Sequence, residues 1–188
     1  MHNMMRPLLG LLGPAPDPGR LGLSDWDMVV RQARRADVLA RVGSLAKMHG
    51  VWESIAPSAR LHIASALALA TRQQRELRFE VGHIEKALRS VGVPTVLLKG
   101  GAYALAGLNA SLGRMVSDVD ILVPRERLSD VETALMMAGW VQTSHDAYDQ
   151  HYYRTWMHEL PPLRHMHRGA VLDVHHAIVP LTARARPS

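Results

Sequence analysis

The stretch that decides the fold reads Val116-Ser117-Asp118-Val119-Asp120-Ile121-Leu122-Val123. An apolar run with acids at alternate positions is typical of a β-strand, because successive strand side chains point to opposite faces of a sheet. Asp118 and Asp120 are therefore expected on one face, with branched apolar side chains on the other. Two carboxylates beside a core repel each other and lose hydration, which is costly. A bound divalent cation would offset that cost, so the stretch predicts a metal site.

A second motif precedes this strand. Residues 94–98 form a short apolar run that predicts a buried strand, and Lys99-Gly100-Gly101 predicts a turn into a short helix over 102–108. Glycines let a backbone approach a phosphate closely, and N–H groups at a helix start favour an anion. The Lys99 ammonium would add a positive charge. A Gly-Gly turn alone is more often only a turn, so the phosphate-binding interpretation depends on the acids that follow.

A third acid lies in another apolar run, Leu172-Asp173-Val174-His175. Magnesium prefers hard oxygen ligands and commonly binds one or two protein carboxylates together with substrate phosphates. Three strand carboxylates and a phosphate turn describe a two-metal site for phosphoryl or nucleotidyl transfer, in which the third acid can bridge a metal and act as general base. By alternation, His175 shares the face of Asp173 and is expected to line the site. A single strand Asp is more often structural, and the order of the three elements favours function.

Changes in composition along the chain predict four parts: a flexible leader over 1–22, a helical segment over 23–91, a core with strands over 92–180, and a disordered tail over 181–188. The helical content comes first and the strands follow. This order indicates a mixed architecture with an added helical piece.

Local signals predict where the first helices begin and end. Ser24 is expected to cap the first helix, with Asp27 at its third position, and Gly50 to end it. Pro57 suits the first turn of a second helix, which runs to about residue 90 with a break expected near Gly82.

Beyond residue 92, short apolar runs bounded by turn residues predict further strands. Strands are expected over 118–123, 140–143, 151–158 and 170–178, turns over 160–163 and 168–169, and a helix from Pro124 to a cap at Gly139.

The composition bounds the partners. A net charge of +5 favours anionic partners such as nucleotides, but the arginines are spread along predicted helices, so nucleic acid is not expected as a partner. The chain has no cysteine, which excludes disulfides, thiolate zinc sites and cysteine nucleophiles and fits a cytoplasmic location. The apolar patch over residues 8–12 is too short to span a bilayer, so no membrane partner is expected.

Seven of the eleven histidines lie between His145 and His176. The pairs His165-x-His167 and His175-His176 could indicate a transition-metal site. That interpretation is disfavoured, because neighbouring strand residues point to opposite faces and no cysteine contributes.

Together these motifs resemble a known family. The likeness is carried by Leu97-Leu98-Lys99-Gly100-Gly101-Ala102, Gly113-Arg114, Asp118-Val119-Asp120-Ile121-Leu122-Val123, His158-Glu159-Leu160-Pro161-Pro162-Leu163 and Leu172-Asp173-Val174-His175-His176. They are similar to the bacterial uncharacterised nucleotidyltransferase family, within the DNA polymerase beta-like nucleotidyltransferase superfamily. The likeness covers about residues 30–180, and the pairing of Lys-Gly-Gly with Asp-x-Asp is its more specific part.

The resemblance implies an α/β (α+β) fold, with a mixed sheet flanked by helices. It also implies two Mg²⁺ ions as cofactors and ATP or another nucleoside triphosphate as substrate. By position, the triphosphate would be held by Gly100 and Gly101, and Arg114 would grip a phosphate through its planar guanidinium. Ser117 stands where relatives often have glycine and could bond a phosphate oxygen. The metal-binding and catalytic residues implied are Asp118, Asp120 and Asp173.

We therefore expect a magnesium-dependent nucleotidyltransferase that moves a nucleoside monophosphate, AMP from ATP, onto a hydroxyl of a small molecule or protein. The alternative is a weakly active or inactive nucleotidyltransferase-like module that binds a partner, of antitoxin or regulatory type. The chain ends about a dozen residues after His176, sooner than the family pattern, so a homodimer or partner protein could complete acceptor binding. The three intact acids favour the enzyme.

Overall fold

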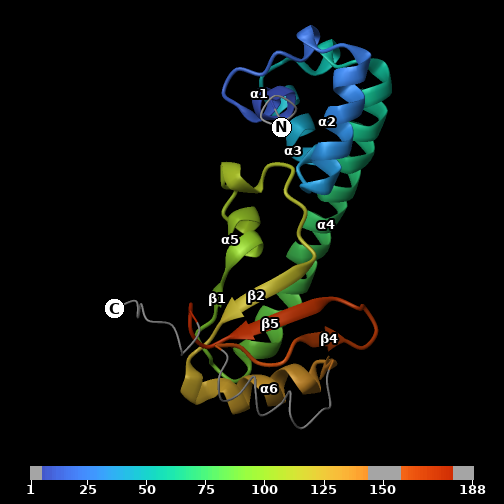
Figure 1. Ribbon diagram of the computed structural model, residues 1–188. Helices are drawn as coiled ribbons and strands as arrows, with labels where there is room; N and C mark the ends of the chain where they lie inside the picture. The colour runs from blue at the N-terminus through green and yellow to red at the C-terminus, as the bar shows by residue number, and fades with distance from the viewer. Residues whose placement is uncertain (1–5, 144–157, 180–188) are drawn as a thin grey trace. The chain divides into compact units, whose positions relative to one another are not determined.

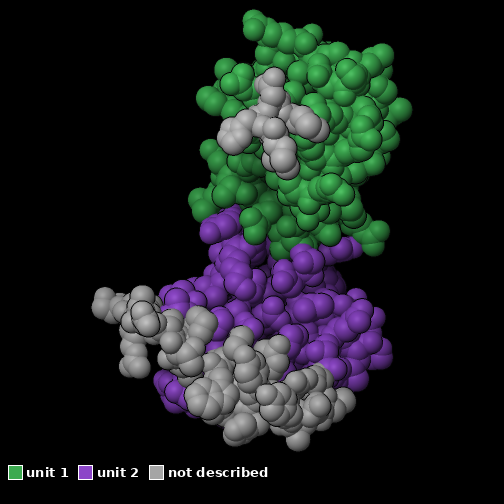
Figure 2. Space-filling view, viewed as in Figure 1, with its two compact units in different colours: residues 1–75, 107–116 green, residues 76–106, 117–188 purple. Residues whose placement is uncertain are grey.

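The computed structural model describes residues 6–143 and 158–179 (Figure 1). The chain divides into two compact units: unit 1 holds residues 1–75 and 107–116, and unit 2 holds residues 76–106 and 117–188 (Figure 2). The tail predicted over 181–188 lies outside the described residues, as does the strand predicted over 151–158 except for its last residue. Among the described helices, none combines the length and apolarity needed to cross a lipid bilayer.

Unit 1 is helical. Its described elements are α1 (Arg6–Leu12), η1 (Pro18–Arg20), α2 (Leu23–Arg35), α3 (Leu39–Met48), η2 (Trp52–Ser54), the first part of α4 (Pro57–Arg89) and η3 (Asn109–Ser111). Its core is an apolar cluster from α1, α2, α3 and α4 that includes Trp26, Val29, Val42 and Ile63.

The amino-terminal segment is packed in this core. Leu8 and Leu11 of α1 are almost completely buried and belong to the same cluster as Trp26. The expectation of a flexible leader is therefore wrong for the described residues of that segment. Burial of two leucines on one face of a short helix provides the apolar contact that holds it.

The first predicted helix differs in its start and its length. Its cap is Gly22, whose backbone N–H donates to Asp25 Oδ2 at 3.1 Å, so the predicted cap residue Ser24 is instead the second residue of α2. The helix also breaks before α3, where Asp37 adopts a left-handed backbone with φ +53°. Gly50, with φ +70°, follows α3 as expected.

Helix α4 begins at Pro57 as predicted and continues for 33 residues without the break expected near Gly82. A Cβ at Gly82 would meet no other atom within 4 Å, so this glycine lies at an open surface and nothing there interrupts the helix. The early part of α4 buries Ile63 in unit 1, and the later part buries Ile84 and Leu88 in unit 2. One helix thus belongs to both units, and the boundary predicted at residue 92 does not match them.

Unit 2 contains a five-stranded mixed sheet in the order β1-β2-β5-β4-β3. The strands are β1 (Val96–Leu97), β2 (Asp118–Leu122), β3 (Trp140–Gln142), β4 (Leu163–His165) and β5 (Val171–His175). β2 and β5 pair in parallel, and the other neighbours pair antiparallel. The predicted α+β class with a mixed sheet is confirmed. β4 was not predicted, because its short run follows two prolines.

Three helical elements complete unit 2: α5 (Lys99–Leu105), η4 (Arg125–Arg127) and α6 (Leu128–Met137). α6 runs along the sheet in Figure 1 and buries Val131 and Leu135. Gly139, with φ +92°, ends this segment as predicted. The expected turn at Lys99-Gly100-Gly101 is wrong, because these residues form the first turn of α5.

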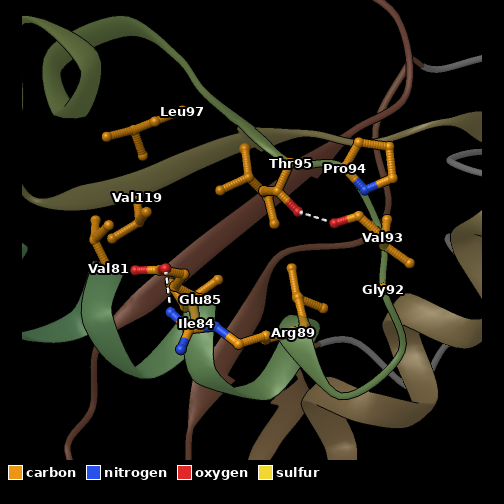
Figure 3. Close-up of a pocket in the computed structure, with 12 residues that line it drawn as sticks. Val81, Ile84, Glu85, Arg89, Gly92, Val93, Pro94, Thr95, Leu97 and Val119 are labelled. Atoms are coloured by element: carbon orange, nitrogen blue, oxygen red, sulfur yellow. Dashed lines mark hydrogen bonds and ion pairs between the residues drawn. The ribbon is translucent and has the colours of Figure 1, made fainter.

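The face of β2 opposite the acids adjoins the later part of α4. Val119 and Ile121 line an apolar cavity of about 570 Å³ together with Ile84 and Leu88 (Figure 3). The alternation predicted for this strand is therefore confirmed, with branched apolar side chains on one face and the acids on the other. This cavity lies on the opposite side of the strand from the carboxylates.

Candidate functional site

The three acids predicted from the sequence converge on one face of the sheet. Asp120 of β2 is the register partner of Asp173 of β5, and Asp118 lies two residues before Asp120 on the same strand. Neighbouring strands are about 4.8 Å apart, so the register places the two partners side by side. Burial raises the pKa of the Asp173 carboxyl, and the negative charges of Asp120, Glu159 and Asp118 raise it further. The carboxylates therefore act on one another electrostatically, as a shared site requires.

Asp120 is the most buried member of this trio and has two basic neighbours. Lys99 Nζ donates to Asp120 Oδ1, and His175 Nε2 lies 3.0 Å from the same oxygen. Burial alone would raise the pKa of Asp120, but the hydrogen bonds from His175 and Lys99 outweigh it and lower that pKa below its usual 3.8. Asp120 is thus held ionised at neutral pH.

The start of α5 brings Lys99 to the carboxylates. Leu98 N–H donates to Asp120 O at 2.9 Å, which ties the end of β1 to β2, and Lys99 then adopts a left-handed backbone with φ +46°. The hydrogen bond to Asp120 raises the pKa of the Lys99 ammonium, although partial burial opposes it. The Lys99 side chain is 56% exposed, so the ammonium lies between solvent and the site.

The two glycines are needed for close packing. Gly100 and Gly101 are both buried in the first turn of α5. A Cβ at Gly101 would lie 3.1 Å from Leu97 Cδ1 and 3.2 Å from Leu97 Cγ. Helix α5 therefore approaches β1 more closely than a larger residue at Gly101 would allow, and this approach positions Lys99. The contact of Gly100 and Gly101 with a triphosphate stays a prediction.

One oxygen of the site has no partner. Asp173 Oδ1 is buried and makes no hydrogen bond within the described part of the chain. An unpaired buried acceptor beside other carboxylates is costly, and a hard divalent cation is the kind of ligand that would satisfy it. The donor set of Asp118, Asp120 and Asp173, all carboxylate oxygens, fits Mg²⁺ by its chemistry.

Glu159 belongs to the site and was not predicted to act there. Its Oε2 lies 3.1 Å from Nδ1 of His175, whose Nε2 faces Asp120. The segment is placed by an isolated β-bridge between Glu159 and His175 and by the hydrogen bond from Leu160 N–H to Val174 O at 2.8 Å. This pairing connects residues far apart in sequence, so no local pattern indicated it. The predicted location of His175 on the face of Asp173 is consistent with these contacts.

The last two predicted phosphate ligands lie in different units. Ser117, in unit 2, donates from Oγ to Asp118 Oδ1 at 3.4 Å. Arg114 lies in unit 1, where its N–H donates to Ser111 O at 3.0 Å. The preceding Gly113 has φ +62°, and a Cβ there would lie 2.4 Å from Arg41 N, so the loop is packed against the start of α3. A phosphate contact by Arg114 stays a prediction.

His165 is used within the fold. Its Nδ1 accepts the backbone N–H groups of His167 at 3.2 Å and Arg168 at 3.3 Å, which closes the turn between β4 and β5. Burial lowers the pKa of His165, and the Arg168 charge lowers it further. With Nδ1 engaged in this turn, a metal site formed by His165 and His167, already disfavoured from the sequence, gains no support.

Comparison with known families identifies the family of this chain. A family model described as an uncharacterised nucleotidyltransferase matches residues 23–188, which is most of the chain. No curated protein and no solved structure shows significant similarity. The match includes β1, α5, β2 and β5, the elements that position the site described above.

Proposed function

This chain belongs to the uncharacterised nucleotidyltransferase family, and on that premise we propose that it is a magnesium-dependent enzyme that transfers AMP from ATP to a hydroxyl of a small molecule or protein. In this reaction the hydroxyl oxygen bonds to the α-phosphorus, the bond to the β-phosphate oxygen breaks, and pyrophosphate leaves. The observation that carries the proposal is the convergence of Asp118, Asp120 and Asp173 on one face, with a buried oxygen of Asp173 unpartnered.

Mg²⁺ would be held by the carboxylates of Asp118, Asp120 and Asp173. When bound, the metal would neutralise charge on the phosphates and make the acceptor hydroxyl a better nucleophile. Two ions are expected, because three carboxylates exceed the one or two that a single Mg²⁺ usually takes from a protein.

Asp173 is the proposed general base. Its pKa is raised by burial and by neighbouring negative charge. As the third acid, beside its register partner Asp120, Asp173 would accept the proton of the acceptor hydroxyl. Asp120, whose pKa is lowered, stays a negatively charged ligand throughout. Both register partners would thus hold metal, and Asp173 would also act as the base.

Lys99, His175 and Glu159 would orient the site. His175 is 2% exposed and lies between carboxylates of Asp120 and Glu159, so it fixes Asp120 Oδ1 and leaves Oδ2 for a ligand. The exposed ammonium of Lys99 provides a positive charge for an incoming triphosphate. Gly101 contributes by letting α5 hold Lys99 close to β2.

The test is transfer of label from α-³²P-ATP to acceptors in a cell extract, with Mg²⁺ present. Asp118→Asn is expected to lower transfer at least about 100-fold, the usual effect of removing one charge-stabilising group. Asp130→Asn is the matched control. Asp130 is an exposed carboxylate of α6, and its Oδ2 lies 2.7 Å from Nε of Arg127 in η4. Circular dichroism checks that each variant is folded.

Equal transfer by the parent and Asp118→Asn would overturn the proposal. If the parent transfers no label, calorimetric titration with ATP separates the remaining readings. Heat that requires Mg²⁺ keeps the nucleotide site, whereas no heat with or without Mg²⁺ favours the partner-binding module.

A further inference from the structure

The imidazole of His175 has a carboxylate oxygen at each nitrogen. Asp120 Oδ1 lies 3.0 Å from Nε2, and Glu159 Oε2 lies 3.1 Å from Nδ1. A neutral imidazole has one N–H, so it can donate to only one of them and presents a lone pair to the other. Two facing lone pairs at this distance need a cation between them, either a second proton or a metal ion.

A third ligand atom lies close by. His158 Nε2 is 4.0 Å from Glu159 Oε2, and the ring centroids of His158 and His175 are 5.3 Å apart. One ligand atom from each of the three residues lies within 4.8 Å of the others. Ligands at 2.0–2.1 Å from a tetrahedral ion are about 3.3 Å apart. The contact between Glu159 and His175 is near that spacing, whereas the 4.0 Å between His158 Nε2 and Glu159 Oε2 is longer than it.

The surroundings also fit a metal site. A histidine that binds a metal usually donates its other N–H to a carboxylate, which fixes the ring. His175 has that arrangement, since its Nε2 faces the almost fully buried carboxylate of Asp120. Nδ1 of His158 is buried and has no hydrogen-bond partner within residues 6–143 and 158–179. Within the described residues, His158 therefore lacks the carboxylate partner that His175 has at its other ring nitrogen.

We propose that His158, Glu159 and His175 form a binding site for a divalent transition-metal ion of the zinc class, with a fourth position open. Two imidazoles and one carboxylate favour Zn²⁺ or Co²⁺ over Mg²⁺. The site is distinct from the oxygen-only trio of Asp118, Asp120 and Asp173. The two are connected by the contact between Asp120 and His175. It also differs from the histidine pairs considered from the sequence, since the partners of His175 come from the segment before β4.

The test uses the full chain after treatment with a chelator, in excess Mg²⁺ and without nucleotide. Co²⁺ is titrated by its visible d–d absorption, and Zn²⁺ by displacement of Co²⁺. One equivalent of Co²⁺ with a strong four-coordinate spectrum is expected. His158→Gln and Glu159→Gln should each weaken Co²⁺ binding by at least about 100-fold, because each removes a ligand and loss of an outer-shell partner alone costs about 10–100-fold. His167→Ala, which removes an exposed histidine of the same unit, should bind as the parent does.

Three results would overturn the proposal: no stoichiometric Co²⁺ spectrum, unchanged affinity in both variants, or a site lost in Asp118→Asn but retained in Glu159→Gln. The last result would place the ion on the carboxylate trio. Thermal unfolding of each variant in chelator identifies a loss that comes from misfolding. Because no nucleotide is used, failure of the transfer reaction leaves this test unaffected.

Discussion

Asp120 and Asp173 are register partners in the parallel pair of β2 and β5. Their environments push their carboxyl groups in opposite directions. Hydrogen bonds from His175 and Lys99 lower the pKa of Asp120 despite its burial, whereas burial and nearby negative charge raise the pKa of Asp173. One pair of neighbouring strands thus holds an acid with a lowered pKa beside an acid with a raised pKa.

Asp173→Asn is expected to stabilise the protein when chelator is present. Because the pKa of Asp173 is raised in the folded state, its ionisation opposes folding as the pH rises above its usual 3.8. The substitution removes that cost, so at pH 7 the free energy of unfolding should rise by about 1 kcal/mol, a common size for a stabilising substitution. Urea unfolding at pH 7 and pH 3 measures it, with Asp130→Asn as control. A gain at pH 3 as large as at pH 7 would contradict this explanation.

Lys99→Met is expected to destabilise the protein only within a pH window. The pKa of Asp120 is lowered below 3.8, so the stability from its ion pair is lost as the pH falls through that lowered value. The pKa of Lys99 is raised above 10.5, so the same stability is lost as the pH rises through that raised value. Between these limits the difference in unfolding free energy should be constant, and below about 1 kcal/mol because Lys99 is largely exposed.

Urea unfolding of Lys99→Met across the pH range, in chelator, measures this window. Lys86→Met removes another exposed ammonium from the same unit and serves as the control. A difference that persists unchanged at pH 2 would show that Lys99 stabilises the fold by packing rather than by charge.

Gly113→Ala is expected to cost far more stability than Gly107→Ala. Both glycines have a left-handed backbone, with φ +62° and +65°, and each substitution should cost about 1–2 kcal/mol from that conformation alone. A Cβ at Gly107 meets nothing within 4 Å, but at Gly113 it would lie 2.4–2.5 Å from backbone atoms of Ala40 and Arg41. Overpacking adds about 1–3 kcal/mol, so Gly113→Ala should lose roughly 2–5 kcal/mol in total. Equal losses in the two variants would refute the close packing of this loop.

The ion pair of Glu80 and Arg168 is expected to couple more strongly than that of Glu85 and Arg89. Glu80 is buried, and Arg168 donates to its two carboxylate oxygens at 2.7 and 2.9 Å. A double-mutant cycle should give a coupling of about 1.5–3 kcal/mol for this pair, the range for hydrogen bonds between charged groups. The exposed pair on the same helix, 2.6 Å apart, should give about 0.5 kcal/mol or less. Similar couplings in both cycles would contradict a structural role for Glu80.

Sequence reasoning predicted the features that depend on local periodicity. The alternation around Asp118 and Asp120 gave both the strand and its two faces, and the location of His175 followed from the same rule. Pro57 marked the start of α4 because proline suits the first turn of a helix. In each case the deciding information lies within a few residues.

The remaining features depend on contacts between distant segments. Glu159 enters the site through a bridge to His175, sixteen positions later in the chain. A turn was predicted at Lys99-Gly100-Gly101 because glycine disfavours helices. That prediction was wrong because the close packing of Gly101 against Leu97 stabilises a helix start there. The first predicted helix is interrupted at Asp37, whose backbone is left-handed, a conformation that few non-glycine residues adopt. The residues around Asp37 did not indicate this interruption.

The division of α4 between two units has a practical consequence for the choice of truncated proteins. The chain passes between the units after residues 75, 106 and 116, so a single cut releases neither unit whole. A recombinant fragment beginning at residue 92 would lack Ile84 and Leu88, and would leave Val119 and Ile121 facing water. Such a fragment is expected to aggregate. A fragment beginning at residue 57 would retain the whole of α4 but would expose Ile63, which packs with α1, α2 and α3 in the core of unit 1.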